Sequence, residues 1–244
     1  MKIKFYGNSG WITPTDEHSC FSTYTETTKI LFDAGSPKIL TEENVNLNAI
    51  IITHIHFDHI KNLYNLLAYM NRQGRREHLK IYAPVDLRGK ISDEIIPNAD
   101  DFRQFSYEYI TTLPEKIGDI EIKSVISMQK TKPHAKVFSL KLKTEQKTIT
   151  FITDVSLTEE LIEFSKGSDM IICDAAATTE ENCGHLSPIS IRKLLEKTTP
   201  KQIVLTHFDE LEPEEFAKRV NFEGTICAIP NLEINMKNWV LNLT

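Results

Sequence analysis

The sequence predicts an α/β protein in which two β-sheets are covered by helices on their outer faces. Strand-like segments outnumber helical ones in the first half of the chain, and strands alternate with helices in the second half. No linker, repeat or low-complexity segment interrupts this pattern, so we expect one domain over residues 1–244. A chain of 244 residues is long enough for one large domain with a substantial core.

Short apolar segments dominate the first half of the chain. We predict strands over residues 3–6, 19–25, 29–32, 49–52 and 79–83, because these runs are apolar or β-rich and polar or turn-forming residues bound most of them. Residues 60–69 place apolar side chains at helical spacing and predict a helix. Residues 86–109 are less regular, and we expect a loop with a short helix there.

Strands and helices alternate in the second half. The predicted strands cover residues 120–126, 137–142, 148–152, 170–173 and 202–205, and the predicted helices cover residues 157–165, 188–197 and 213–220. Ser187 is a suitable N-cap for the second of these helices, with Pro188 at its first position. Short strands are expected in the tail of the chain.

The charge balance limits the classes of partner. The formal net charge is −6, with 41% hydrophobic and 25% charged residues, which is ordinary for a globular protein. Proteins that neutralise nucleic-acid phosphates are usually basic, so a large nucleic-acid footprint is disfavoured. A local basic pocket, or positive charge from metal ions, stays compatible with this balance. The Arg72-Gln73-Gly74-Arg75-Arg76 cluster is either such a substrate-binding patch or a solvated helix end.

The chain carries no signal for secretion or membrane insertion. Residues 1–5 lead directly into a predicted strand, and no run of 18 apolar residues is present. The cysteines, Cys20, Cys173, Cys183 and Cys227, form no CxxC pair. We therefore expect a cytoplasmic protein with reduced thiols and no membrane partner.

The most informative segment is Thr53-His54-Ile55-His56-Phe57-Asp58-His59, which directly follows an apolar strand. On extended backbone His54 and His56 point to the same side. Asp58 and His59 come after the turn and can face a second point nearby. The spacing therefore offers ligands to two adjacent metal ions. Imidazole and carboxylate favour zinc, with iron or manganese also suitable.

A two-metal site needs further ligands from neighbouring strand ends. His134 precedes a predicted strand, and Asp154 and His207 each directly follow one. Each could be an ordinary polar residue at the end of a strand. Together with a two-metal motif, however, they are predicted to be the remaining ligands.

These elements resemble the metallo-β-lactamase fold superfamily. The matching residues occur in the superfamily's order and cover nearly the whole chain, and they are Asp33 in Phe32-Asp33-Ala34-Gly35, His54-x-His56-x-Asp58-His59, His134, Asp154 and His207. The resemblance implies a four-layer αββα sandwich with a dinuclear metal site at one edge of the two sheets.

The same resemblance implies which residues bind each metal. His54, His56 and His134 are expected to bind the first metal. Asp58, His59 and His207 are expected to bind the second, and Asp154 is expected to bridge both. The resemblance also implies that Asp33 steadies the histidine-rich loop. An aspartate instead of a cysteine at the bridging position departs from true β-lactamases.

Three features favour the branch of ribonuclease Z and phosphoribosyl cyclic phosphodiesterase. Residues 7–15 resemble the start of ribonuclease Z, and Cys183-Gly184-His185-Leu186-Ser187-Pro188 resembles an additional histidine motif of these phosphodiesterases. Only 37 residues follow His207, fewer than the helical substrate domain of glyoxalase II requires. By this resemblance His185 is not a ligand but binds a phosphoryl oxygen or protonates the leaving oxygen. The alternative is a histidine at a helix start with a local hydrogen bond.

One feature of ribonuclease Z is missing. That family carries a long arm, which holds tRNA, between the positions that match His134 and Asp154. Only 19 residues separate these two positions here, so the tRNA arm is absent. The spacing resembles that of compact phosphodiesterases instead, which lowers the expectation of tRNA 3′ processing.

The resulting prediction is an enzyme, a metal-dependent hydrolase. We expect a dinuclear phosphodiesterase that cleaves cyclic or small phosphodiesters by attack of a metal-bound hydroxide, with two divalent ions, zinc first, as cofactors. The predicted catalytic residues are His185 and Asp58, the latter also a ligand. Alternatives are a thioester or lactone hydrolase, a tRNA 3′-processing endonuclease, and a non-catalytic nucleic-acid-binding scaffold. A short phosphodiester or a nucleic acid is the expected partner, and the resemblance is compatible with a homodimer.

Overall fold

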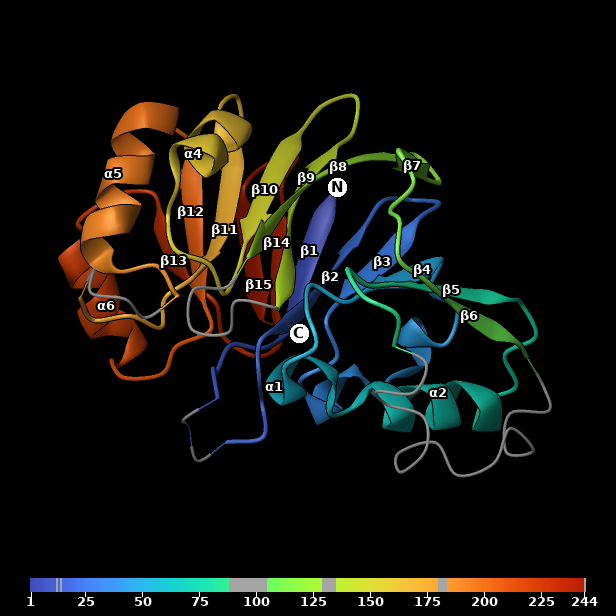
Figure 1. Cartoon of the computed structure of the whole chain (residues 1–244). Coiled ribbons are helices and arrows are strands. Elements are labelled where there is room, and N and C mark those ends of the chain that lie inside the picture. The colour runs from blue at the N-terminus through green and yellow to red at the C-terminus, as the bar shows by residue number, and fades with distance from the viewer. Residues whose placement is uncertain (12, 14, 88–104, 129–134, 180–183, 244) are drawn as a thin grey trace.

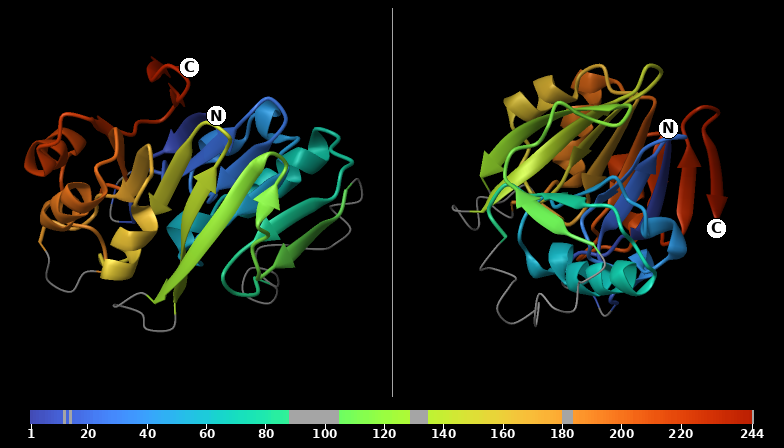
Figure 2. Two further views of the ribbon diagram at one scale, coloured as in Figure 1. Left: turned by 90° about the horizontal axis from the view of Figure 1, so that it is seen from above. Right: turned by 90° about the vertical axis from the view of Figure 1, so that its right-hand side faces the viewer.

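Two β-sheets pack face to face, and helices cover both outer faces (Figure 1). The computed structural model describes residues 1–11, 13, 15–87, 105–128, 135–179 and 184–243. The two additional views in Figure 2 show the same stack of layers from above and from the side. This arrangement confirms the predicted four-layer αββα sandwich.

The first sheet is built mainly from the N-terminal half of the chain. Its strands are β1 (Lys2–Gly7), β2 (Cys20–Tyr24), β3 (Lys29–Phe32), β4 (Ala49–Ile51), β5 (Leu79–Tyr82), β6 (Tyr107–Ile110), β14 (Leu232–Asn235) and β15 (Val240–Leu243). They are hydrogen-bonded in the order β15-β14-β1-β2-β3-β4-β5-β6. Its outer face is covered by α1 (Phe57–Ile60), α2 (Leu63–Arg72) and the 3-10 helices η1 (Pro37–Ile39) and η2 (Glu42–Asn44).

The second sheet is built from the C-terminal half. Its strands are β7 (Lys116–Ile117), β8 (Ile120–Met128), β9 (Lys136–Lys143), β10 (Thr148–Ile152), β11 (Met170–Asp174), β12 (Gln202–Thr206) and β13 (Thr225–Cys227). They are hydrogen-bonded in the order β13-β12-β11-β10-β9-β8-β7. Its outer face is covered by α4 (Glu159–Ser165), α5 (Pro188–Thr198) and α6 (Pro213–Val220).

Aromatic side chains join the two sheets through their inner faces. Phe21 of the first sheet stacks on Phe32, with ring centroids 4.9 Å apart. Phe21 also meets Phe151 of the second sheet edge to face at 4.8 Å. All three rings are fully buried, and burial of such large apolar side chains is a main source of fold stability.

Parallel strands in both sheets place their carboxyl ends at one edge of the sandwich. Strands β3 and β4 are parallel in the first sheet, and β10, β11 and β12 are parallel in the second. Hydrogen bonds join the sheets at this edge, where Phe138 N donates to Thr53 O over 2.9 Å. The hydroxyl groups of Ser19 and Thr206 also lie 2.9 Å apart. Residues that follow these strands are therefore brought together.

The helix predicted over residues 60–69 is interrupted in the structure. Its first residue ends α1, residues 61 and 62 lie between the two helices, and residues 63–69 lie in α2. The interruption arises because the segment after β3 bonds to the helical backbone, with Ala34 N donating to His59 O over 2.7 Å and Asn62 N donating to Ala34 O over 2.9 Å. These bonds replace part of the helical ladder and hold the metal-motif turn against β3.

Two further local predictions can be compared with the structure. Tyr107–Ile110 forms β6, so the end of the segment expected to be irregular is a strand at the sheet edge, and residues 88–104 lie outside the described part of the chain. Ser187 caps α5 as predicted, since its hydroxyl accepts from Ser190 N over 3.2 Å and Pro188 occupies the first turn.

Arg75 of the basic cluster is buried and has a structural role. It is only 3% exposed, and its guanidinium donates to the carbonyl oxygens of Val45 and Leu47 over 2.6 and 3.0 Å. It therefore ties the end of α2 to the turn before β4. In the part of the chain that the structure describes, no helix has the length and apolar composition needed to cross a membrane.

Candidate metal centre

Imidazole and carboxylate groups gather where the parallel strands of both sheets end. The residues that follow or end these strands are Asp33 after β3, His54, His56, Asp58 and His59 after β4, Asp154 after β10, Asp174 at the end of β11, and His207 after β12. All are buried except His56, whose side chain is 20% exposed. A cluster of this kind requires charge compensation, because burying unpaired charges is costly.

Four donor atoms lie close together around one point. They are Asp58 Oδ2, His59 Nε2, His207 Nε2 and Asp154 Oδ1, and we call them the second donor group because they match the ligands predicted for the second metal. His207 Nε2 lies 3.1 Å from Asp58 Oδ2 and 3.2 Å from His59 Nε2. His59 Nε2 lies 3.3 Å from Asp58 Oδ2, and both imidazoles lie 3.5 Å from Asp154 Oδ1. Four ligands placed tetrahedrally around a zinc ion at its usual bond lengths lie roughly 3.4 Å apart. These separations fit one such ion.

A further group, called the first donor group, is formed by His54 Nε2, His56 Nδ1 and Asp154 Oδ2. His54 Nε2 lies 2.9 Å from His56 Nδ1 and 3.3 Å from Asp154 Oδ2. His56 Nδ1 lies 3.9 Å from the same carboxylate oxygen. His134, which was predicted to complete this group, lies outside the described residues.

Asp154 belongs to both donor groups because its two carboxylate oxygens face different sides. Oδ2 faces His54 and His56, whereas Oδ1 faces His59 and His207. The backbone of Asp154 has a left-handed conformation, with φ of 51°. Asp33 and His207, the corresponding strand-end residues, have φ of 60° and 59°. Non-glycine residues adopt this conformation rarely and at an energetic cost, and such residues concentrate at functional sites.

Asp33 fixes the orientation of the histidine-rich segment. Its carboxylate accepts from Thr53 N over 2.7 Å and from the Thr53 hydroxyl over 2.9 Å. The other ring nitrogen of His59, Nδ1, lies 2.8 Å from Asp33 Oδ2. Because a carboxylate only accepts, the proton lies on Nδ1 and the lone pair of Nε2 faces the second donor group.

Two members of the cluster, His54 and Asp154, have the protonation states that suit metal binding. Despite burial, the neighbouring carboxylates raise the pKa of His59 and His207, so a metal ion would have to displace a proton from each of these two rings. Burial, together with the neighbouring His59, lowers the pKa of His54 to about 4, so this ring is neutral at pH 7. Burial opposes the ionisation of Asp154, but the nearby His207 and His54 hold its pKa well below the ordinary value. A neutral imidazole and an ionised carboxylate are the forms that coordinate metal ions.

The carboxylates of the site have histidines as their charged neighbours. Asp33, Asp58, Asp154 and Asp174 are each 3% exposed or less. Within the described part of the chain, every ion pair of these four carboxylates is to a histidine, and no lysine or arginine reaches them. Raised pKa values of His59 and His207 balance this buried negative charge with protons, and divalent cations would supply the positive charge instead.

Asp174 and His185 form a pair beside the cluster. His185 Nδ1 lies 2.8 Å from Asp174 Oδ2, and the His185 ring stacks on His207 with centroids 5.5 Å apart. Burial disfavours the charged ring, but the hydrogen bond and charge of Asp174 hold the pKa of His185 above its ordinary value. The sequence predicted His185 but missed Asp174. A sequence signal for Asp174 was present, because it lies at the end of an apolar strand, just as Asp154 and His207 lie after the ends of apolar strands.

Comparison with known families identifies this arrangement. The family model described as "Beta-lactamase superfamily domain" matches residues 28–208, about three quarters of the chain. The chain belongs to the metallo-β-lactamase superfamily. It is accordingly an enzyme of the metal-dependent hydrolase class, as the histidine-rich motif predicted.

Relatives within this superfamily include ribonuclease Z. The chain is 25% identical to ribonuclease Z of Clostridium tetani, and the alignment covers 88% of this chain and 89% of that protein. It superposes on the human short-form tRNase Z with a TM-score of 0.71 at 20% identity, covering 97% of this chain and 99% of that one. It superposes on a diphosphatase from the PhnP family with a TM-score of 0.72 at 16% identity, covering 100% and 99%.

The ribonuclease Z alignment also shows a difference in length. It spans 283 positions, more than the 244 residues of this chain, so the Clostridium tetani protein has residues that this superfamily member lacks. Between residues 135 and 154 the chain forms only β9, a short turn and β10. The described residues of this interval contain no inserted arm.

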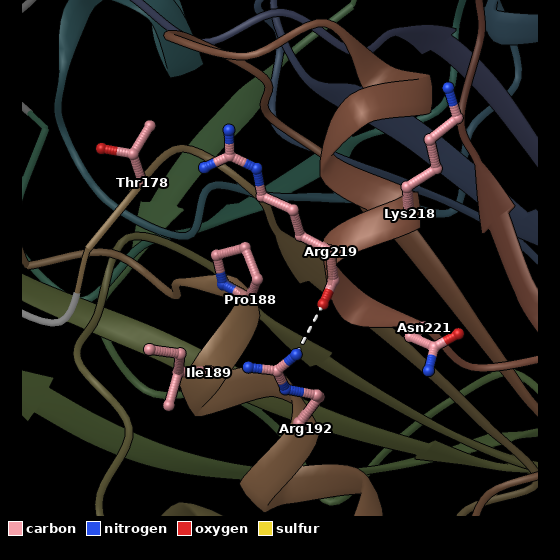
Figure 3. A pocket seen from close by; sticks show the side chains of 7 residues that line it. All are labelled: Thr178, Pro188, Ile189, Arg192, Lys218, Arg219 and Asn221. Carbon is pink, nitrogen blue, oxygen red and sulfur yellow. Dashed lines mark hydrogen bonds between the residues drawn. The ribbon is translucent and has the colours of Figure 1, made fainter.

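A basic hollow lies on the outer side of α5 and α6 (Figure 3). It has a volume of about 420 Å³, and its lining includes Arg192, Lys218 and Arg219. Arg192 Nη1 donates to the Arg219 carbonyl oxygen over 2.9 Å, which fixes its guanidinium at the hollow. The net negative charge of this superfamily member therefore does not prevent a local positive surface.

Removal of the Asp33 carboxylate is expected to weaken metal binding. Asp33→Ala leaves His59 Nδ1 and the Thr53 N–H without their acceptor, and loss of such a partner typically costs about 10- to 100-fold in metal affinity. Competition with a chromogenic chelator measures this change. Glu121→Ala, at an exposed residue of β8, should retain wild-type affinity. Equal affinities for wild type and Asp33→Ala would contradict the role of Asp33.

Proposed function

We propose that this chain is a phosphodiesterase that holds two divalent metal ions and cleaves cyclic or other small phosphodiesters. The observation that carries the proposal is the placement of Asp154, whose two oxygens face separate groups of buried imidazoles. A carboxylate in this position can bind two adjacent cations, one through each oxygen, whereas a single cation would leave one oxygen without a cation.

The proposed ligands are the two donor groups together with His134, which the sequence predicts. They are His54, His56 and His134 for the first ion, Asp58, His59 and His207 for the second, and Asp154 for both. Zinc is the first choice because imidazole nitrogens predominate among these donors, and manganese or iron also accepts this set. Two divalent ions would bring four positive charges to a region with the four buried carboxylates Asp33, Asp58, Asp154 and Asp174.

The chemistry divides between the ions and the protein. When bound, a pair of divalent ions lowers the pKa of a water molecule to near neutrality and offsets negative charge on the phosphoryl group. Asp33 and Thr153 hold the donor groups in place, since the Thr153 hydroxyl donates to Asp154 Oδ1 over 2.7 Å. Asp58 would accept the proton of the attacking water through Oδ1, since its Oδ2 faces the imidazoles of His59 and His207.

His185 is proposed to act at the leaving oxygen. Its Nδ1 is held by Asp174, which directs the opposite ring edge, with Nε2, away from that carboxylate. A protonated ring in this position supplies a proton to the departing oxygen, and Asp174 stabilises the charged form. An acid for a leaving alkoxide suits phosphodiester cleavage, in which an alkoxide must depart.

The substrate class is supported by the relatives and by chain length. A matched relative carries the name ribonuclease Z, and a structural neighbour is a diphosphatase. The interval of residues 135–154 has no arm that could hold a tRNA. A compact phosphodiester is therefore favoured over a folded RNA. A thioester or lactone hydrolase remains the rival activity, because the same donor groups can also serve acyl substrates.

The decisive experiment is a substrate panel with metal-loaded protein. Zinc- and manganese-loaded samples are tested on bis(p-nitrophenyl) phosphate, a nucleoside 2′,3′-cyclic phosphate, S-lactoylglutathione and an acyl-homoserine lactone. We expect hydrolysis of the phosphodiesters with a kcat/KM at least about 100-fold above that for the acyl substrates. Preference for either acyl substrate would overturn the proposal.

A second candidate function is tRNA 3′ processing. The observation in its favour is the match to ribonuclease Z of Clostridium tetani over 88% of this chain. A precursor tRNA with a 3′ trailer tests it directly. Cleavage at the trailer boundary at a rate above that of the small phosphodiesters would make this the preferred function.

A further inference from the structure

Two exposed aromatic side chains contact each other on the surface of this protein. The rings of Trp11 and Phe57 meet edge to face, with centroids 5.9 Å apart and an interplanar angle of 86°. Trp11 is 57% exposed and Phe57 is 52% exposed. Among the residues that the structure describes, these are the only phenylalanine, tyrosine or tryptophan side chains in the exposed class.

The pair lies at the rim of the candidate metal centre. Phe57 stands between His56 and Asp58, which belong to the first and second donor groups. Trp11 follows Gly10, whose N–H donates to Phe208 O over 2.8 Å, directly after His207. Phe57 is therefore attached to the first-sheet side of the centre, and Trp11 is anchored to the second-sheet side.

Specific contacts hold the segment before and after Trp11. Gly10 O is 2.7 Å from the ring nitrogen Nδ1 of the buried His18. Lys61, just after α1, forms an ion pair with Asp16 over 2.7 Å, and this pair links the Trp11 loop to the helix of Phe57. A side chain at position 10 would collide with Asp209, so glycine permits this close approach to the segment after β12.

A purely structural role does not account for this exposure. A pair that served only to close the loop on α1 would be expected to bury its rings, because burial of apolar area is the source of its stabilisation. Here the two rings stay more than half exposed beside a site for which a substrate is proposed. Perpendicular rings also form a corner, in which a flat group can touch one ring by its face and the other by its edge.

We propose that Trp11 and Phe57 bind a nucleobase of the phosphodiester substrate, so that the preferred substrates are nucleotides and not base-free sugar phosphates. This inference rests on the proposed phosphodiesterase function and adds the class of its substrate. Aromatic side chains stack on any base, and removal of one such contact typically weakens binding by about 5- to 100-fold. Proximity to the donor groups would place the base next to the phosphate that is cleaved.

Binding can be measured without catalysis. The chain has two tryptophans, and Trp239→Phe leaves Trp11 as the only one. Adenosine 5′-monophosphate and ribose 5-phosphate share their sugar and phosphate and differ in the base. We expect the nucleotide to quench Trp11 fluorescence saturably and, by calorimetry on the metal-loaded protein, to bind at least about 5-fold more tightly than ribose 5-phosphate.

Variants of the pair distinguish stacking from a structural role. Phe57→Leu and Trp11→Ala should weaken nucleotide binding about 5- to 100-fold and change ribose 5-phosphate binding much less, whereas Trp11→Phe should retain most of the preference. Leu241→Ala, on β15 at the far edge of the first sheet and 47% exposed, is the matched surface control. Metal content is measured for each variant, because Phe57 lies between proposed ligands.

Two results would overturn the inference. One is equal affinity of the wild type for the nucleotide and for ribose 5-phosphate. The other is an equal loss of affinity for both ligands in Phe57→Leu and Trp11→Ala at unchanged metal content. The proposed function can fail independently of this inference. Base-dependent binding without phosphodiester hydrolysis would support the aromatic binding site and exclude the phosphodiesterase activity. Hydrolysis without any base preference would support the phosphodiesterase activity and exclude the aromatic binding site.

Discussion

Replacement of Asp154 is expected to remove most of the bound metal and nearly all activity. Asp154→Ala removes an oxygen from both donor groups, so each group loses a ligand and the negative charge between them disappears. We expect the affinity for both metal ions to fall, and kcat/KM for bis(p-nitrophenyl) phosphate to fall by about 10³-fold or more. Metal ions contribute several kcal/mol to transition-state stabilisation, and each ~1.4 kcal/mol corresponds to a factor of ten in rate.

The control for Asp154 separates the ligand from the backbone. Asp154 has a positive φ of 51°, which alanine tolerates poorly, whereas asparagine adopts this conformation comparatively well. Asp154→Asn should therefore keep the thermal stability of the loop better and still lose most metal and activity. Elemental analysis of both purified variants gives the metal-to-protein ratio. Retention of both ions at wild-type occupancy in Asp154→Asn and Asp154→Ala would remove Asp154 as the bridge.

His185→Ala is expected to lower activity strongly while the metals stay bound. His185 lies beside His207 but belongs to neither donor group, and its ring nitrogen Nδ1 is occupied by Asp174. Loss of a general acid typically costs about 10²- to 10⁴-fold in rate. Asp174→Asn should lower kcat by a smaller factor, because the ring stays in place without the carboxylate that stabilises its charged form. Metal content should equal that of the wild type in both variants.

The dependence on the leaving group decides which role His185 performs. p-Nitrophenolate is a stable anion that leaves without a proton, whereas the alkoxide of a nucleoside 2′,3′-cyclic phosphate needs one. A proton donor predicts a large loss for the cyclic phosphate and a small loss for the p-nitrophenyl ester in His185→Ala. Equal losses would assign His185 to binding a phosphoryl oxygen. No loss for either substrate would exclude both roles.

Most of the secondary structure could be predicted from local sequence pattern. Strands such as β1, β9 and β10 were found because apolar and β-branched residues mark buried strands, and α5 was found from its cap at Ser187. β6 and β7 were missed because short edge strands carry a weak pattern. The break between α1 and α2 was missed because its cause is Ala34, a residue of a distant segment.

The residues of the candidate site can also be separated into those that the sequence predicted and those that it missed. The histidine-rich motif stood out by its residue types and spacing, and the strand-end residues Asp154 and His207 stood out because they follow such a motif in the order of the superfamily. Asp174 did not stand out, since an aspartate at the end of a strand is common and only its 2.8 Å contact with His185 gives it meaning. In the sequence, Arg75 belongs to a basic cluster that could form a surface patch. In the structure it is buried and donates to two backbone carbonyl oxygens.

By itself, the sequence determined the fold class and the superfamily and predicted most of the proposed ligands, because these depend on local pattern and on residue order. Only the tertiary structure showed which donor atoms lie close together, with the two oxygens of Asp154 facing different imidazoles, and that the ring of Trp11 contacts that of Phe57. Both depend on the convergence of parallel strand ends from two sheets, which places residues far apart in the chain, such as Asp58 and His207, within 3.1 Å of each other.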